Sequence, residues 1–330
     1  MIGHKRQFEI IKQAINGTNL SHVYLITGAQ GVGKDTFAKH ISKSLFCTSP
    51  LSTKPCHECA SCVQITAGYH SDFAAVAPLQ NKAEIGIDQI RDLKSFTSIK
   101  GINENVRIVI IDGADKLTEE AANSLLKILE EPLGNILFFL LASEIRSVLP
   151  TIRSRSAHIH LAPVPLNDFV LSDQSKDGVN ITASDAWRES GGYPGAAIKL
   201  MSDPTQMVRK MEYRRLFIEV INRNGWQLLK SFLDKDIEES VGDEFKPSEW
   251  GLELTSHWLE FARDLVMIKL GLNELARGKT KPEVVEASKA ITLNGALRIC
   301  EEIINARRSI ARHANVKLTI ESLVLNLMRI

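Results

Sequence analysis

The sequence predicts an α/β fold with a parallel sheet in its first half and an all-helical region in its second half. Three observations indicate this. Apolar strand patterns alternate with helical patterns up to about residue 163, a glycine-rich turn joins the first strand to its helix, and strand patterns disappear from about residue 164 onward. Strands that form continuous apolar runs are typical of parallel sheets whose two faces are covered by helices.

The individual elements follow from local patterns. A first helix is expected within residues 1–20, ending near Asn16-Gly17, because Phe8, Ile11 and Ile15 share one helical face. An apolar strand, a turn and a helix follow over residues 23–46. Further strands are expected at residues 73–77, 106–111, 138–142 and 158–161, and further helices at residues 88–96, 118–130, 207–222, 226–233, 250–270, 282–290, 294–312 and 319–329.

Length and charge exclude some classes of protein. A chain of 330 residues is long enough for two or three domains, and a formal charge of +1 gives no overall bias toward nucleic acid. The longest strongly apolar run, residues 136–142, is too short to cross a bilayer, and the amino terminus lacks an export signal. We therefore expect a cytoplasmic protein with no membrane association.

The turn after the first strand has the pattern of a phosphate-binding P-loop, since residues 28–34 read Gly-Ala-Gln-Gly-Val-Gly-Lys. Its glycines let successive backbone N–H groups point at one anion, and Lys34 is placed to neutralise terminal phosphates. These glycines are Gly28, Gly31 and Gly33. Asp35 stands where the pattern requires a Ser or Thr hydroxyl for magnesium, and Thr36 comes one residue late. Because one helical residue rotates a side chain by about 100°, we do not expect Thr36 to replace that hydroxyl.

A second part of a nucleotide site is expected after the strand at residues 106–111. Asp112 ends this strand, as does the aspartate that joins the magnesium shell in P-loop enzymes. The next residue in an active ATPase of the AAA+ type is usually a glutamate that polarises water, but here it is Gly113. Asp115 would replace this glutamate only if the turn bent back. Asp112 has an alternative role, because an aspartate at the end of a strand is also common as a helix cap. We expect a degenerate site, and binding of ATP and magnesium stays open.

Four of the five cysteines lie close together in the sequence. Cys47, Cys56, Cys59 and Cys62 give the spacing C-x8-C-x2-C-x2-C, whose short steps suit a tight turn around a tetrahedral ion. Four thiolates leave no position for water, so we expect a structural zinc ion. Free cysteines or a redox pair are the alternative. Cys300 lies in an apolar helical pattern and is expected to pack in a core.

Residues 151–156 read Thr-Ile-Arg-Ser-Arg-Ser and place two arginines before a short strand. Such a segment is usually a solvated loop. A guanidinium at a domain edge can instead reach a neighbouring subunit's nucleotide and stabilise charge on the transferred phosphoryl group. Arg155 is the first candidate for this arginine finger, and Arg153 is the second.

Together these features resemble the clamp-loader subunits of bacterial DNA polymerase III, and among them the delta-prime family. The similarity runs through the first 200 residues and is fainter at the carboxyl end. The four-cysteine insertion, the block from Asn123 to Pro132 and the Ser-Arg-Ser segment are, in combination, specific to clamp-loader subunits. The similar segments are residues 45–62, 70–78, 110–132, 151–156 and 315–330.

The resemblance implies a domain organisation. A P-loop domain of the RecA-like AAA+ type is expected over residues 1–163, with a zinc-binding insertion at residues 47–62. A small helical lid is expected over residues 164–204, and a helical collar, through which five subunits assemble, over residues 205–330.

The resemblance also implies a role. The family is a non-motor stator that contacts gamma/tau and delta subunits, helps to load the sliding clamp onto primed DNA in replication, and donates an arginine, here Arg155, in trans to a gamma/tau ATP site. Asp35, Gly113 and Gly195 stand where motor subunits have a hydroxyl, a glutamate and a lid arginine. The chain is then a subunit of a DNA-directed DNA polymerase (nucleotidyltransferase) holoenzyme without ATPase or polymerase activity of its own. The four cysteines match the family's zinc ligands, and Ser156 replaces a cysteine that usually ends the arginine motif.

Two other functions stay open. The chain is an active gamma/tau-like ATPase if Asp35 still recruits magnesium. It is a zinc-dependent DNA-binding module on an inactive ATPase scaffold if its local basic groups bind DNA. No aromatic residues interleave with these groups for base stacking, which favours solvated faces. The groups are Lys43, Lys54 and Lys82 near the cysteines and Arg307, Arg308 and Arg312 on a late helix.

Overall fold

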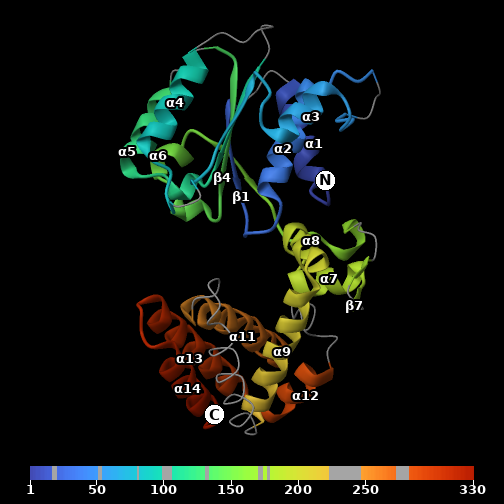
Figure 1. Cartoon of the computed structure of the whole chain (residues 1–330), viewed down its shortest axis with the longest axis vertical. Helices are drawn as coiled ribbons and strands as arrows, with labels where there is room; N and C mark the ends of the chain where they lie inside the picture. The colour runs from blue at the N-terminus through green and yellow to red at the C-terminus, as the bar shows by residue number, and fades with distance from the viewer. Residues whose placement is uncertain are drawn as a thin grey trace. The chain divides into compact units, whose positions relative to one another are not determined.

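The structure is a computed structural model of the whole chain. It describes residues 1–330 except 17–20, 51–53, 80–81, 99–105, 131–133, 170–173, 177–178, 223–246 and 273–281. The chain divides into two compact units (Figure 1). Unit 1 comprises residues 1–173 and 182–199, and unit 2 comprises residues 174–181 and 200–330.

Unit 1 contains a sheet of five parallel strands in the order β2-β3-β4-β1-β5. The central strands are the most apolar, and every residue of β1 and β4 is buried. The order reverses at β1, so the loops that leave the carboxyl ends of β1, β3 and β4 meet at one edge of the sheet. Such a reversal is where open α/β sheets bind ligands. The strands are β1 (Val23–Thr27), β2 (Phe73–Val76), β3 (Arg107–Asp112), β4 (Ile136–Ala142) and β5 (Ala157–His160).

Helices cover both faces of this sheet (Figure 1). One core joins Val23 and Leu25 of β1 to α4, α5 and α6, and a second core joins Tyr24 and Ile26 to α1, α2 and α3. The alternation along one strand is the expected period of two for a sheet that is buried on both sides. The helices are α1 (Lys5–Asn16), α2 (Lys34–Phe46), α3 (Ala60–Ala67), α4 (Ile87–Ser98), α5 (Glu119–Glu130) and α6 (Pro150–Arg153).

Two short helices complete unit 1. They are α7 (Ala183–Ser190) and α8 (Pro194–Ser202). Only the residues of α8 up to Lys199 belong to unit 1. Thr182 caps α7 by accepting a hydrogen bond from the backbone N–H of Asp185, and Gly191 ends it in the left-handed region at φ 68°. Single turns of 3-10 helix lie at η1 (Ala114–Lys116), η2 (Ile145–Ser147) and η3 (Leu166–Asp168).

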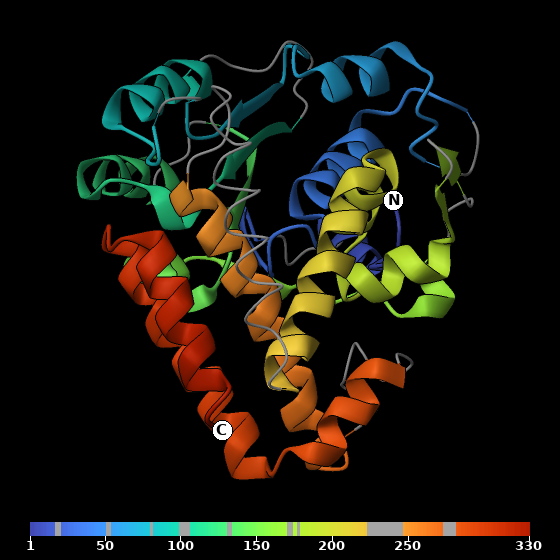
Figure 2. The ribbon, with the colours of Figure 1, turned by 60° about the horizontal axis from the view of Figure 1, so that its bottom comes forward.

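Unit 2 consists mainly of helices (Figure 2). In its apolar core Trp258, Tyr213 and Phe217 are fully buried, and the Trp258 Nε1–H donates to the Tyr213 carbonyl at 3.1 Å. Cys300 packs against this core, as predicted. The helix α11 packs along α13, and α13 packs along α14. The helices are α9 (Pro204–Ile221), α11 (Pro247–Lys269), α12 (Pro282–Ala290), α13 (Leu293–Ala311) and α14 (Val316–Leu327).

Most predicted elements are confirmed, with ends that differ by a few residues. Two were missed. The helix α3 lies inside what the sequence presented as a polar insertion, and the predicted end of strand structure near residue 164 is wrong, because β6 (Gln174–Lys176) and β7 (Val179–Ile181) form an antiparallel hairpin. Three-residue strands are too short to show periodicity, although the Asp-Gly pair at 177–178 is a hairpin signal. The helix predicted at residues 226–233 lies outside the described residues. None of the helices in the described part of the chain has an apolar stretch of the length that a bilayer requires.

Candidate functional site

The P-loop leaves the buried strand β1 and enters α2 through glycines in the left-handed region. Gly31 has φ 81° and Gly33 has φ 100°, conformations that side chains rarely adopt. The loop begins where the Gly28 N–H donates to the Ala142 carbonyl at the end of β4, 3.3 Å away. The predicted glycines are therefore brought together at the carboxyl edge of the sheet.

The carbonyls of this loop accept hydrogen bonds from several parts of the chain. The Lys34 ammonium donates to the Gly28 carbonyl at 2.6 Å and to the Ala29 carbonyl at 3.2 Å. The His4 Nε2 lies 3.1 Å from the Val32 carbonyl and must carry its proton there, because a carbonyl only accepts. The loop conformation is thus held by protein groups, and Lys34 directs two of its three N–H donors to the loop itself.

The amino terminus of α8 lies directly against the P-loop. The Gly195 N–H donates to the Gly31 carbonyl at 2.8 Å. A Cβ atom on Gly195 would lie 3.1 Å from that carbonyl oxygen, and a Cβ on Gly31 would lie 3.2 Å from the backbone nitrogen of Ala196. Glycine at both positions permits this approach of backbone to backbone. Gly195 is the position at which the resemblance places the missing arginine of motor subunits.

Charged groups lie beside the loop. Burial lowers the pKa of Lys34, against the opposing effect of the Asp112 and Asp115 carboxylates. Burial also raises the pKa of Asp112, and the nearby Asp35 carboxylate raises it further while Lys34 opposes this. Asp35 forms an ion pair with Lys39 at 3.0 Å on the first turns of α2. The carboxylate that replaces the expected hydroxyl therefore adds negative charge where phosphates would bind.

The turn after β3 is shaped for glycine. Gly113 has φ 108°, and a Cβ there would lie 3.3 Å from the Lys116 side chain. The Asp115 Oδ2 accepts a hydrogen bond from the Ser143 backbone N–H at 3.0 Å, which joins this turn to the end of β4. Asp115 was considered as a replacement for the water-polarising glutamate. Here its carboxylate accepts a hydrogen bond that stabilises the turn. Thr36 is exposed on α2.

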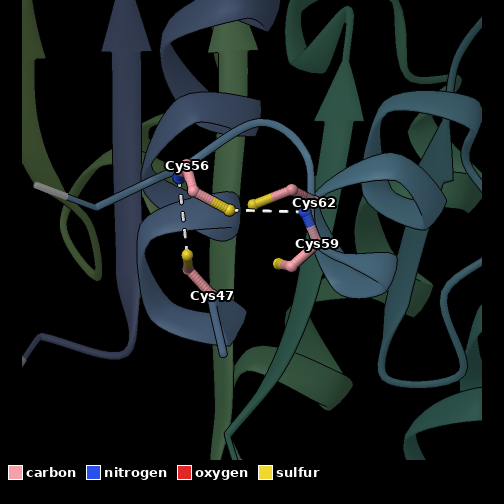
Figure 3. A group of neighbouring side chains, drawn as sticks. All are labelled: Cys47, Cys56, Cys59 and Cys62. Atoms are coloured by element: carbon pink, nitrogen blue, oxygen red, sulfur yellow. Dashed lines mark hydrogen bonds between the residues drawn. The ribbon is translucent and has the colours of Figure 1, made fainter. Parts of the chain in front are cut away.

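The four cysteines converge on one point beside α2 and α3 (Figure 3). Their sulfur atoms all lie within 4.8 Å of one another, a group that can hold a metal ion. Cys47 and Cys62 are buried, and Cys56 and Cys59 are partly exposed. The Cys56 N–H points at the Cys47 sulfur at 3.4 Å, and the Cys59 N–H points at the Cys56 sulfur at 3.3 Å. Backbone N–H groups directed at sulfur stabilise thiolates, the form that binds metal.

The Ser-Arg-Ser segment is fixed to the helix that precedes it. The Ser154 hydroxyl donates to the Thr151 carbonyl at 3.0 Å, and the Ser156 hydroxyl donates to the Ile152 carbonyl at 2.7 Å. The Arg155 Nη1 donates to the Thr151 carbonyl at 3.2 Å, and its Nη2 lies 2.6 Å from Glu130 Oε1 at the end of α5. Arg155 remains 41% exposed. The backbone around Arg155 is thus held by hydrogen bonds to α6, while its guanidinium remains accessible to solvent.

Sequence reasoning missed two features near this segment. The first is Glu130, which no local pattern connects with Arg155. The second is a cluster on β5, where the buried Thr27 hydroxyl lies 2.7 Å from His158 Nε2 and 3.2 Å from His160 Nδ1. The alternation His-Ile-His places both rings on one face of the edge strand, and this pattern could have predicted that the two histidines lie together.

The basic groups considered for DNA binding differ in their surroundings. Lys54 and Lys82 are exposed. The Arg307 Nη1 donates to the Ser256 hydroxyl at 2.6 Å and so links α13 to α11. At least one member of the arginine group therefore has a packing role.

The chain is similar in sequence to known subunits of DNA polymerase III. The sequence model described as "DNA polymerase III, delta subunit" matches residues 3–165. DNA polymerase III subunit delta' of Escherichia coli K12 is 32% identical over 213 residues, which cover 63% of each chain. The chain is therefore similar to the delta' subunits of DNA polymerase III. The alignment with the E. coli subunit covers less than two thirds of that protein's length.

Two further similarities extend beyond the delta-prime family. A gamma/tau subunit of DNA polymerase III from Mycobacterium tuberculosis H37Rv is 30% identical over 165 residues, covering 50% of this chain and 28% of that one. The crystal structure of a DNA polymerase III gamma subunit-related protein from Thermotoga maritima matches 98% of this chain and 99% of its own with a TM-score of 0.50 and 19% identity. At this identity the structural match bears on the fold alone.

The contact between the P-loop and α8 can be tested with two glycines that share the same φ of 81°. We expect Gly68→Ala, which meets no atom within 4 Å, to lower the free energy of unfolding by about 1 kcal/mol through backbone strain alone. Gly31→Ala adds crowding against Ala196 and should cost about 1 to 3 kcal/mol more. The measurement is chemical denaturation of the two variants. Equal destabilisation would mean that α8 does not lie against the loop in solution.

Proposed function

We propose that this chain is a non-motor stator subunit of the DNA polymerase III clamp loader, which helps to load the sliding clamp onto primed DNA in replication. The observation that carries the proposal is an accessible Arg155 on a pinned backbone, in a chain whose own nucleotide site lacks groups for hydrolysis. The match to the family model and the similarity to the delta' subunit of E. coli support the same role. The arginine acts in trans, on the nucleotide of a neighbouring gamma/tau subunit.

The domain organisation proposed with this role has three parts. Residues 1–163 form the AAA+ domain, residues 164–204 form a helical lid, and residues 205–330 form a collar that joins this chain to gamma/tau and delta subunits in a pentamer. The separate core of unit 2 supports an independent helical assembly domain. Asp203, which caps α9 through the Thr205 N–H, supports a boundary near residue 204.

The chain's own nucleotide site is proposed to be degenerate. Asp35 places a carboxylate at the magnesium-binding position, and Gly113 occupies a turn at φ 108° in which a glutamate would be strained. Lys34 and the glycines Gly28, Gly31 and Gly33 keep the elements that hold phosphate, and Asp112 would face any magnesium ion. Binding of nucleotide thus stays a prediction, while hydrolysis by this chain is not expected.

The cysteine cluster is proposed to hold structural zinc. Cys47, Cys56, Cys59 and Cys62 supply four sulfur donors, the set of a closed tetrahedral zinc site. Cys47 follows the end of α2 and Cys59 precedes α3, so the ion would tie the two helices together. With four protein ligands no site is left for a reacting water, so its contribution is to stability.

Zinc content tests the ligand assignment. We expect the wild-type chain to bind about one zinc ion and Cys59→Ser to lose most of it, since three sulfurs and a hydroxyl form a weaker site. Metal analysis by mass spectrometry and thermal unfolding measure the two effects. Cys300→Ser is the control, because Cys300 lies in the other unit. Unchanged zinc in Cys59→Ser would contradict the assignment.

Arg155→Ala tests the trans arginine. We expect the assembled complex to form normally and its ATPase rate to fall between about twofold and tenfold, because only the site served by this subunit loses its arginine. Co-purification and steady-state ATP hydrolysis measure assembly and rate. Arg153→Ala tests the second candidate in the same segment, and a fall in rate in that variant alone would assign the arginine finger to Arg153. Loss of assembly in Arg155→Ala would make the residue structural, and an unchanged rate would remove the trans role.

Hydrolysis by the isolated chain separates stator from motor. The alternative of a gamma/tau-like ATPase is favoured by the retained Lys34 and by the similarity to gamma/tau subunits. We expect the purified chain to hydrolyse ATP far below the rate of about 1 s⁻¹ at the low end of typical enzymes. A motor-like rate that Lys34→Ala abolishes would favour the alternative.

A further inference from the structure

Glu130 occupies a position that is unfavourable for its own helix. It is the last residue of α5, where the carbonyl groups that lack intrahelical partners create a partial negative charge. A carboxylate there repels this charge, and helices prefer cations at this end. The placement of Glu130 thus costs helix stability, and its one ion pair among the described residues is with Arg155, at 2.6 Å.

The ion pair with Arg155 contributes too little free energy to explain why a glutamate stands at this position. The two side chains are 41% and 48% exposed, and surface ion pairs contribute about 0 to 1 kcal/mol because water and salt screen them. The pair instead fixes the orientation of the Arg155 guanidinium. The Thr151 carbonyl holds Arg155 Nη1 and Glu130 holds Nη2, so a long flexible side chain is anchored at both of its terminal nitrogens.

Two anchors leave part of the guanidinium able to bind an anion. The group has five N–H donors in a rigid plane, and each anchor needs one of them. The exposed remainder is suited to phosphate oxygens, whose geometry matches the guanidinium fork. An arginine that is already ordered loses less conformational entropy when it meets a phosphate, so pre-positioning raises its effect on a reaction.

We propose that Glu130 is a positioning residue that holds Arg155 in the orientation in which it meets the triphosphate of a neighbouring subunit. The inference rests on the proposed function of Arg155 and deepens it. Glu130 itself touches no reacting atom. Its charge acts through the guanidinium, and its placement at the end of α5 couples that orientation to the parallel sheet.

The test uses the assembled complex and five variants of this chain, the fifth being Arg155→Ala. Glu130→Gln removes the charge and keeps the shape, and Glu130→Asp keeps the charge on a shorter side chain. Glu120→Gln is the matched control, because it removes the same charge from an exposed position on the same helix. The fourth is the Glu130→Gln, Arg155→Ala double variant, read against Arg155→Ala alone. The measurements are kcat and KM for ATP, with thermal unfolding to confirm folding.

We expect Glu130→Gln to lower kcat between about twofold and fivefold with KM changed less than about twofold, and Glu130→Asp to recover part of the loss. Glu120→Gln should match the wild type. The double variant should be no slower than Arg155→Ala alone, because the carboxylate acts only through the arginine. If Glu130→Gln matches Glu120→Gln, raises kcat, or slows the Arg155→Ala complex further, the proposal is overturned. An unchanged rate in Arg155→Ala would instead overturn the proposed function itself.

Discussion

The backbone contact between Gly31 and Gly195 is the constraint on which the arrangement of the nucleotide site depends. It joins the P-loop to the first turn of α8 by a hydrogen bond of 2.8 Å, at a separation that would crowd a Cβ atom on either glycine. Because both groups are backbone, the contact is short and directional and cannot adjust through side-chain rotamers. The Lys34 and His4 bonds to neighbouring carbonyls add to it. The conformation of the loop is therefore stabilised by hydrogen bonds within the protein.

The two candidate sites of unit 1 place different demands on the chain. Hydrolysis in its own site would require a hydroxyl, a carboxylate and a cation in fixed relation, and Asp35 and Gly113 remove two of these. Donating an arginine to another subunit requires only a stable backbone and an accessible guanidinium. The serines on both sides of Arg155 supply the first by bonding to carbonyls of α6, and the exposure of Arg155 supplies the second. The proposed absence of hydrolysis in this chain is therefore compatible with the proposed donation of Arg155 to a neighbouring subunit.

The cysteine cluster solves a different problem, that of stabilising a segment with few apolar residues. Among the described residues from 47 to 62, only Cys47, Pro55 and Cys62 are buried. Such a segment gains little from the hydrophobic effect, and a bound ion would supply the missing free energy by fixing both helix ends. The convergence of four sulfurs within 4.8 Å is the geometry that this explanation requires.

The sequence by itself determined the features that local patterns encode. Apolar runs specified β1, β3 and β4, the glycines and Lys34 specified the P-loop, and the cysteine spacing specified the cluster, because each pattern lies within a few residues. The short elements α3, β6 and β7 were missed since they contain too few residues to show a period. Only the tertiary structure decided which distant groups meet: Gly195 with Gly31, Glu130 with Arg155, and Thr27 with His158 and His160. These pairs depend on how strands are ordered and helices are packed, and that order is set by burial over the whole domain, which no local stretch of sequence records.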